Sequence, residues 1–169
     1  MKVALIMGSD SDLPVIQPAL DTLRQFQVNC EVLVASAHRT PEVVHRFAAD
    51  AADRGVKVII AAAGAAAHLP GVVASFTALP VIGVPINSTS VGGLDALLSI
   101  VQMPAGIPVA TMAINGAKNA ALFALQILAT GDENLDLRFK EYRADMAAEV
   151  ERKNANLQAK LQQQTHTDN

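Results

Sequence analysis

The segment Ser36-Ala37-His38-Arg39-Thr40-Pro41 places a hydroxyl, an imidazole and a guanidinium side by side, directly after a mostly apolar run at 30–35. Arginine can bind a phosphate through two parallel hydrogen bonds, and histidine titrates near neutral pH, which suits proton transfer. A lone histidine at a strand end is more often a structural hydrogen-bonding residue. Because a second anion-binding segment is expected nearby, we interpret His38 as a proton shuttle and Arg39 as a phosphate ligand.

That second segment is Gly8-Ser9-Asp10-Ser11-Asp12, which precedes a helical pattern. Hydroxyls and free backbone N–H groups at a helix N-terminus attract anions, and a carboxylate there can hold ribose hydroxyls. Plain N-capping of the helix explains the same residues equally well. The glycine patterns typical of dinucleotide and nucleoside triphosphate sites are absent from the sequence.

A third segment, 64–71, consists mainly of small residues and contains His68. Small residues let a flat ring approach the main chain, although tight packing against a neighbouring subunit would need the same composition. His38 and His45 do not form a metal pair, because Pro41 separates His38 from the helix that carries His45, and no acidic or cysteine cluster completes a site. The sequence predicts no metal site and no cofactor.

The elements that must position these segments alternate between strands and helices. Apolar runs predict strands at 3–7, 28–35, 56–62, 81–84 and 109–113, and helical patterns follow at 15–26, 41–54, before Phe76, and at 94–102 and 118–129. This alternation predicts right-handed crossovers and a three-layer α/β/α sandwich, flavodoxin-like, with a parallel sheet of about five strands. Ligands bind such sheets at the carboxyl ends of the strands, where segments 8–12, 36–41, 64–71 and 87–93 would meet.

From Asp132 onward the chain becomes charged and rich in glutamine, and its apolar residues recur at helical spacing. They are Leu135, Phe139, Tyr142, Met146, Val150, Leu157 and Leu161. The pattern predicts a long helix that packs on another subunit; the alternative is a frayed tail after Asn154, and we expect disorder from Gln162 to Asn169. We predict one domain, in which 1–131 form the catalytic unit and 132–169 the C-terminal helix and tail at an oligomer interface.

The composition narrows the range of partners. Of the 169 residues 51% are hydrophobic and 17% charged, with a net charge of −3, which argues against binding to nucleic acid or to an anionic membrane. No apolar run reaches the roughly 20 residues of a membrane-spanning helix. Cys30 is the only cysteine, and no cleavable leader is evident after Met1, so we expect a cytoplasmic protein. The large apolar fraction favours buried contacts between copies of the chain.

Taken together, the segments resemble the class I N5-carboxyaminoimidazole ribonucleotide mutase family of purine biosynthesis. The resemblance rests on six ordered motifs: Met7-Gly8-Ser9 with Ser11-Asp12, Ser36 to Pro41, Ala63 to Gly71, Gly83-Val84-Pro85, Gly93-Leu94-Asp95 leading to Ser99 to Pro104, and Asn119 to Leu122. It implies a homo-octameric, metal-free enzyme that moves a carboxylate from the exocyclic nitrogen of an aminoimidazole ribonucleotide to ring carbon C4.

The resemblance also implies roles for individual residues. Ser9, Asp12 and Arg39 would contact the ribose phosphate, with Ser11 and Ser36 nearby, and His38 would carry the proton. The residues along the base and its carboxylate would be Gly64, Ala65, Ala66, His68 and Leu69. The loop at 87–93 would arrive from a neighbouring subunit.

Two other functions fit parts of the sequence. A related class II carboxylase would use free CO2 and the uncarboxylated ribonucleotide. A non-catalytic, flavodoxin-like nucleotide-binding module would need only the fold and the anion-binding loop.

Overall fold

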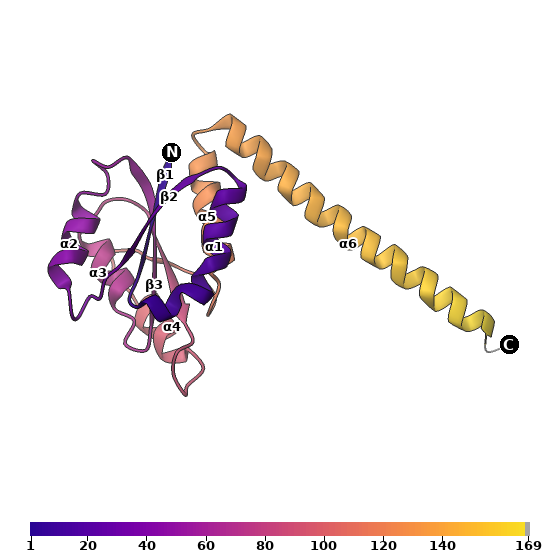
Figure 1. The fold of residues 1–169 in the computed structure, drawn as a ribbon, viewed down its shortest axis with the longest axis horizontal. Coiled ribbons are helices and arrows are strands. Elements are labelled where there is room, and N and C mark those ends of the chain that lie inside the picture. The colour runs from indigo at the N-terminus through magenta and orange to yellow at the C-terminus, as the bar shows by residue number, and fades with distance from the viewer. Residues whose placement is uncertain (168–169) are drawn as a thin grey trace.

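The computed structural model describes residues 1–167 and is built around a five-stranded parallel sheet (Figure 1). The strands are β1 (Lys2–Met7), β2 (Asn29–Val34), β3 (Val56–Gly64), β4 (Val81–Ile86) and β5 (Ala110–Thr111), in the order β2-β1-β3-β4-β5. Each neighbouring pair is parallel. This is the flavodoxin-like strand order, so the predicted fold class is confirmed.

Helices cover both faces of the sheet. The helices α1 (Leu13–Gln25) and α5 (Ala117–Ala129) lie on one face, and α2 (Pro41–Ala49), α3 (Leu69–Ser75) and α4 (Leu94–Val101) contribute to the core on the other. Side chains alternate between the two cores along β1: Leu5 and Met7 enter the first, and Ala4 and Ile6 enter the second. Burial on both faces explains why the strands are continuous apolar runs.

The helix α6 (Glu133–Thr167) begins on this core and then leaves it (Figure 1). Leu135 is fully buried, and the ring of Phe26 lies 5.9 Å from that of Phe139 and 5.5 Å from that of Tyr142, measured between ring centres. Beyond this anchor, Met146 and Val150 are exposed. The predicted long helix is confirmed. It continues to Thr167, where we expected disorder from Gln162, and the last two residues lie outside the described part.

Several element boundaries differ from those predicted. The helix α2 ends at Ala49 rather than Arg54, because residues 50–54 form turns and the Arg54 side chain reaches back to Glu31 and to the Phe47 carbonyl. Strand β4 continues through Pro85 to Ile86, and β5 is only two residues long. A 3-10 turn, η1 (Asp10–Asp12), precedes α1. No helix in the described residues combines the length and apolar content needed to span a membrane.

Candidate active site

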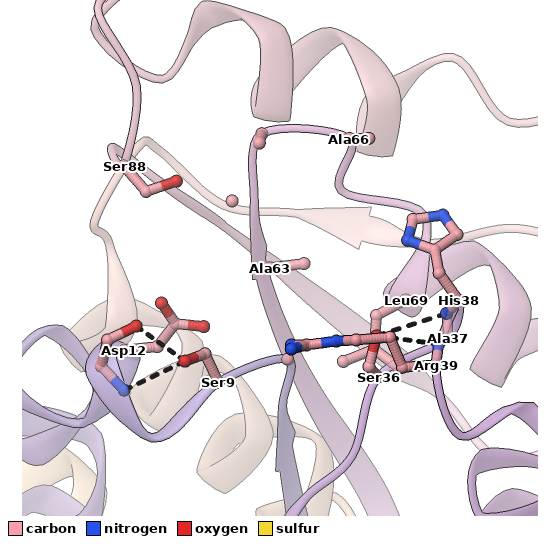
Figure 2. Close-up of a pocket in the computed structure, with 14 residues that line it drawn as sticks. Ser9, Asp12, Ser36, Ala37, His38, Arg39, Ala63, Ala66, Leu69 and Ser88 are labelled. Atoms are coloured by element: carbon pink, nitrogen blue, oxygen red, sulfur yellow. Dashed lines mark hydrogen bonds between the residues drawn. The ribbon is translucent and has the colours of Figure 1, made fainter.

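A cavity of about 300 Å³ opens at the carboxyl ends of β1, β2, β3 and β4 (Figure 2). It lies at the point where the strand order changes direction between β1 and β3, the usual ligand position in this kind of sheet. Its lining consists of small, hydroxyl-bearing and charged residues: Gly8, Ser9, Ser11, Asp12, Ser36, Ala37, His38, Arg39, Ala63, Gly64, Ala65, Ala66, Leu69 and Ser88.

The turn after β1 is organised by Ser9. Its backbone is extended, and its Oγ accepts a hydrogen bond from the backbone N–H of Ser11 at 3.3 Å. The two hydroxyls lie 2.8 Å apart, with Ser11 donating to Ser9. This cap presents two hydroxyls beside the N-terminus of α1, where the helix dipole favours an anion.

Asp12 is the buried carboxyl of the cavity, with only 7% of its surface exposed. Burial raises the pKa of Asp12, a hydrogen bond from the Ser9 backbone lowers it by a smaller amount, and the negative charge of Asp10 raises it further. A carboxylate that is poorly solvated and faces a polar cavity gains from a ligand that donates hydrogen bonds. Ribose hydroxyls are such donors.

Ser36 shapes the turn after β2 that presents His38 and Arg39. Its Oγ accepts hydrogen bonds from the backbone N–H groups of His38 (3.3 Å) and Arg39 (3.2 Å). Its backbone N–H donates to Thr40 Oγ1 at 2.9 Å, and its carbonyl accepts from the Thr40 backbone N–H at 2.9 Å. The oxygen of the Ser36 hydroxyl therefore stabilises the turn by accepting both hydrogen bonds. Arg39 is the cation in the lining of the cavity.

His38 contacts a second imidazole. Its Nε2 lies 2.8 Å from Nδ1 of His68, which belongs to the turn between β3 and α3. Both side chains are exposed. Because one ring nitrogen must donate and the other accept, the contact links the tautomers of the two rings.

The end of β3 forms the cavity wall between the anion site and the imidazole. Ala65 has a positive φ of 52°, which is uncommon for a residue with a side chain, and its carbonyl accepts a 2.8 Å hydrogen bond from the Ala67 backbone. Strained backbone of this kind is concentrated at ligand-binding sites. With only methyl groups from Ala63, Ala65 and Ala66, the wall leaves space for a flat ring.

Most of the predicted site residues line this one cavity. The exception is His68, which is absent from the lining and reaches the site only through His38. Ser88 is a cavity residue that we did not single out; its position directly after β4 was the available signal. The arrival of the loop at 87–93 from a neighbouring subunit stays a prediction; within this chain, Ser88 of the loop lines the cavity.

Two other reactive groups lie outside the cavity. His45 packs edge to face against Phe76, with ring centres 4.5 Å apart. Burial raises the pKa of the Cys30 thiol to about 11, so this half-buried cysteine stays protonated near neutral pH. Within residues 1–167 no group of three or more His, Cys, Asp or Glu side chains is placed to hold a metal ion.

Comparison with known proteins identifies the family of this chain. The model of the family described as AIR carboxylase matches residues 2–149. This chain belongs to the AIR carboxylase family. The family match covers all four loops around the cavity and the start of α6.

Relatives within the AIR carboxylase family carry two different names. The N5-carboxyaminoimidazole ribonucleotide mutase of Pyrococcus abyssi is 60% identical over 145 residues, which cover 86% of this chain and 83% of the relative. The phosphoribosylaminoimidazole carboxylase of Ogataea methanolica is 59% identical over 138 residues, but these cover 82% of this chain and only 25% of that protein. The relative of comparable length is thus the one named as a mutase.

The family resemblance extends to solved structures. The crystal structure of Treponema denticola PurE superposes with a TM-score of 0.79 at 29% identity, covering 88% of this chain and 93% of that chain. The fold of this AIR carboxylase family member is therefore similar to that of a solved structure over most of its length.

Proposed function

We propose that this chain is an isomerase that converts N5-carboxyaminoimidazole ribonucleotide into 4-carboxy-5-aminoimidazole ribonucleotide in purine biosynthesis. The observation that carries the proposal is the cavity itself, in which one imidazole, one guanidinium and one buried carboxyl surround a wall of alanines. Mutase names on relatives 53–60% identical over most of the chain support it.

The residues of the cavity bind different parts of the substrate in this proposal. Arg39 and the Ser9 turn, with Ser11, hold the phosphate; Asp12 accepts from the ribose hydroxyls; and Ser36 keeps the His38–Arg39 turn in place. The wall of Gly64, Ala65, Ala66 and Leu69 lies along the base. His68 acts on the reaction through its contact with His38.

His38 moves the proton in two linked steps. In the first, the bond between the exocyclic nitrogen and the carboxyl carbon breaks, its electron pair stays on nitrogen, and the nitrogen takes a proton from the imidazole as CO2 is released. In the second, C4 attacks the CO2 and its ring proton passes to the imidazole, which restores the starting state. One positioned acid–base group therefore serves both steps. The alanine wall keeps the freed CO2 within reach of C4.

The experiment is an NMR time course with N5-carboxyaminoimidazole ribonucleotide, labelled bicarbonate and a metal chelator, without ATP. Formation of the C4-carboxylated isomer with little label from solution is expected. Product that forms only from the uncarboxylated ribonucleotide and takes up label would make the chain a carboxylase instead. Binding without conversion would leave only a nucleotide-binding module.

We extend the proposal to the assembly and its setting: a cytoplasmic, metal-independent homo-octamer in which 1–131 carry the cavity and 132–169 form a contact arm of the same domain. Metal independence follows from the chemistry above, since protonation by an imidazole suffices. Exposed apolar residues on α4 and α6 support the oligomer: Leu94, Leu98, Val101, Leu137, Met146, Val150, Leu157 and Leu161. Light scattering should give about eight times the chain mass of 17.7 kDa, and a monomer would overturn this part.

A further inference from the structure

Among the hydroxyl-bearing residues that line the cavity in the described part of the chain, Ser88 is the one whose side chain takes no part in a hydrogen bond of the surrounding turns. Ser9 and Ser11 bond to each other, and Ser36 accepts two backbone N–H groups. Within residues 1–167, Ser88 makes no hydrogen bond, although it lines the cavity. Figure 2 shows it on the opposite side of β3 from His38.

The cavity must satisfy two negative groups if the proposed function holds. The phosphate has Arg39 and the Ser9 turn, and the ribose has Asp12. The transferred carboxylate needs a donor of its own, because a buried carboxylate without hydrogen bonds is costly. Apart from His38, the lining hydroxyls that donate to no other group in the described residues are Ser36 and Ser88. Ser36 Oγ is held in its turn by two backbone N–H groups, which leaves Ser88 as the hydroxyl with no hydrogen bond of any kind among the residues that the structure describes.

Gly64 makes room for this hydroxyl at the level of the backbone. A Cβ atom at Gly64 would overlap Ser88 Oγ, and it would lie 3.0 Å from Ser88 Cβ and 3.2 Å from the Ile86 carbonyl oxygen. The Ser88 hydroxyl therefore lies against the end of β3, the wall along which the base is expected to bind. We expect a carboxyl group on a ring bound along this wall to meet this hydroxyl.

We infer that Ser88 binds the substrate by donating a hydrogen bond from its hydroxyl to the carboxylate that is transferred, and so orients this group toward the ring. The inference rests on the proposed function and adds a residue that recognises the carboxylate. Ser88 forms no covalent bond and keeps its proton, so the proton path through His38 is unchanged.

The test compares two ligands on Ser88→Ala by calorimetry. The variant should bind 4-carboxy-5-aminoimidazole ribonucleotide about tenfold more weakly, as expected for a lost hydrogen bond to a charged group, and bind 5-aminoimidazole ribonucleotide within about twofold of the unmodified chain. Ser90→Ala is the matched control, because Ser90 is exposed in the same loop and does not line the cavity. Equal losses for both ligands, or no loss for either, would overturn the inference.

A second measurement separates this inference from the proposed function. In the NMR assay, Ser88→Ala should place more label from bicarbonate into each product molecule, because the carboxyl group is held less firmly. An unmodified chain that converts no substrate would refute the proposed function alone, since the ligand comparison still reports on the contact. If the unmodified chain is active and Ser88→Ala takes up the same amount of label and binds both ligands equally well, only the role of Ser88 is refuted.

Discussion

His38 Nε2 and His68 Nδ1 lie 2.8 Å apart, and their rings meet edge to face at an angle of 84°. The two residues are thirty positions apart in the sequence and come from turns after different strands, β2 and β3. Each imidazole restricts the tautomer of the other. His68 contacts the proposed proton shuttle but does not line the cavity, so we propose that it acts by positioning His38.

Replacing the shuttle tests its role directly. His38→Asn should lower kcat by about 100- to 10,000-fold, the usual contribution of acid–base catalysis, and change nucleotide affinity only a few-fold. Turnover and calorimetry measure the two quantities. The His38 side chain is exposed, so the melting temperature should stay unchanged. Turnover close to that of the unmodified chain would rule out the assigned role.

The partner imidazole is tested by two variants that differ in hydrogen bonding. His68→Asn can still bond to His38 Nε2, whereas His68→Phe cannot. We expect His68→Phe to lose about tenfold in kcat with little change in KM, corresponding to one hydrogen bond, and His68→Asn to recover most of this loss. The pH profile of kcat should shift in the phenylalanine variant. Equal behaviour of the two variants would show that the hydrogen bond is unimportant.

Asp12 should lower the stability of the folded chain at neutral pH and at the same time contribute to substrate binding. Its pKa is raised in the folded state, so stability falls as pH rises from the ordinary aspartate range through this raised pKa. Asp12→Asn should therefore raise the melting temperature at neutral pH, and the gain should vanish below the ordinary aspartate pKa of 3.8. The same variant should bind substrate about tenfold more weakly. Asp53→Asn, at an exposed position, is the control.

The pKa of Glu31 is shifted in the opposite direction to that of Asp12, so its effect on stability has the opposite dependence on pH. Burial acts to raise its pKa, but hydrogen bonds and charges from Arg54 and Lys2 outweigh this and lower it overall. Its contribution to stability is present above its ordinary pKa of 4.5 and is lost as pH falls through the lowered value. Glu31→Gln should cost about 0.5–1 kcal/mol at neutral pH and little at low pH, measured by denaturant titration. Asp136→Asn, in a more exposed ion pair, should cost less.

Asn115 anchors the loop that carries Ser88. Its backbone N–H donates to the Pro85 carbonyl at 2.8 Å, its Oδ1 accepts from the Asn87 N–H at 2.9 Å, and its φ is +58°. Asn115→Ala should destabilise the chain by about 1–3 kcal/mol and raise KM more than it lowers kcat. Asn115→Asp, which keeps the acceptor and tolerates this φ, should restore both. Faster proteolysis at 87–93 in the alanine variant alone would support the anchor.

The sequence predicts the strands, the parallel sheet and the loops around the cavity, because apolar runs and the position of ligands at the carboxyl ends of parallel strands can be read locally. It does not predict contacts made between distant segments. The contact of Arg54 with Glu31 joins segments 23 positions apart, and the pairing of His38 with His68 depends on how β2 and β3 are spaced. Ser88 resembles any polar loop residue until the cavity shows that its hydroxyl is unused.

The strand order also decides when a newly made chain acquires its cavity. The first strand synthesised, β1, lies inside the sheet, and its loop meets those that follow β2, β3 and β4. A nascent chain that has left the ribosome only through β3 has His38 and Arg39, but it lacks His68, Ser88 and the Asn115 anchor. Ligand affinity should therefore arise late in translation, after the residues around Asn115 have left the ribosome.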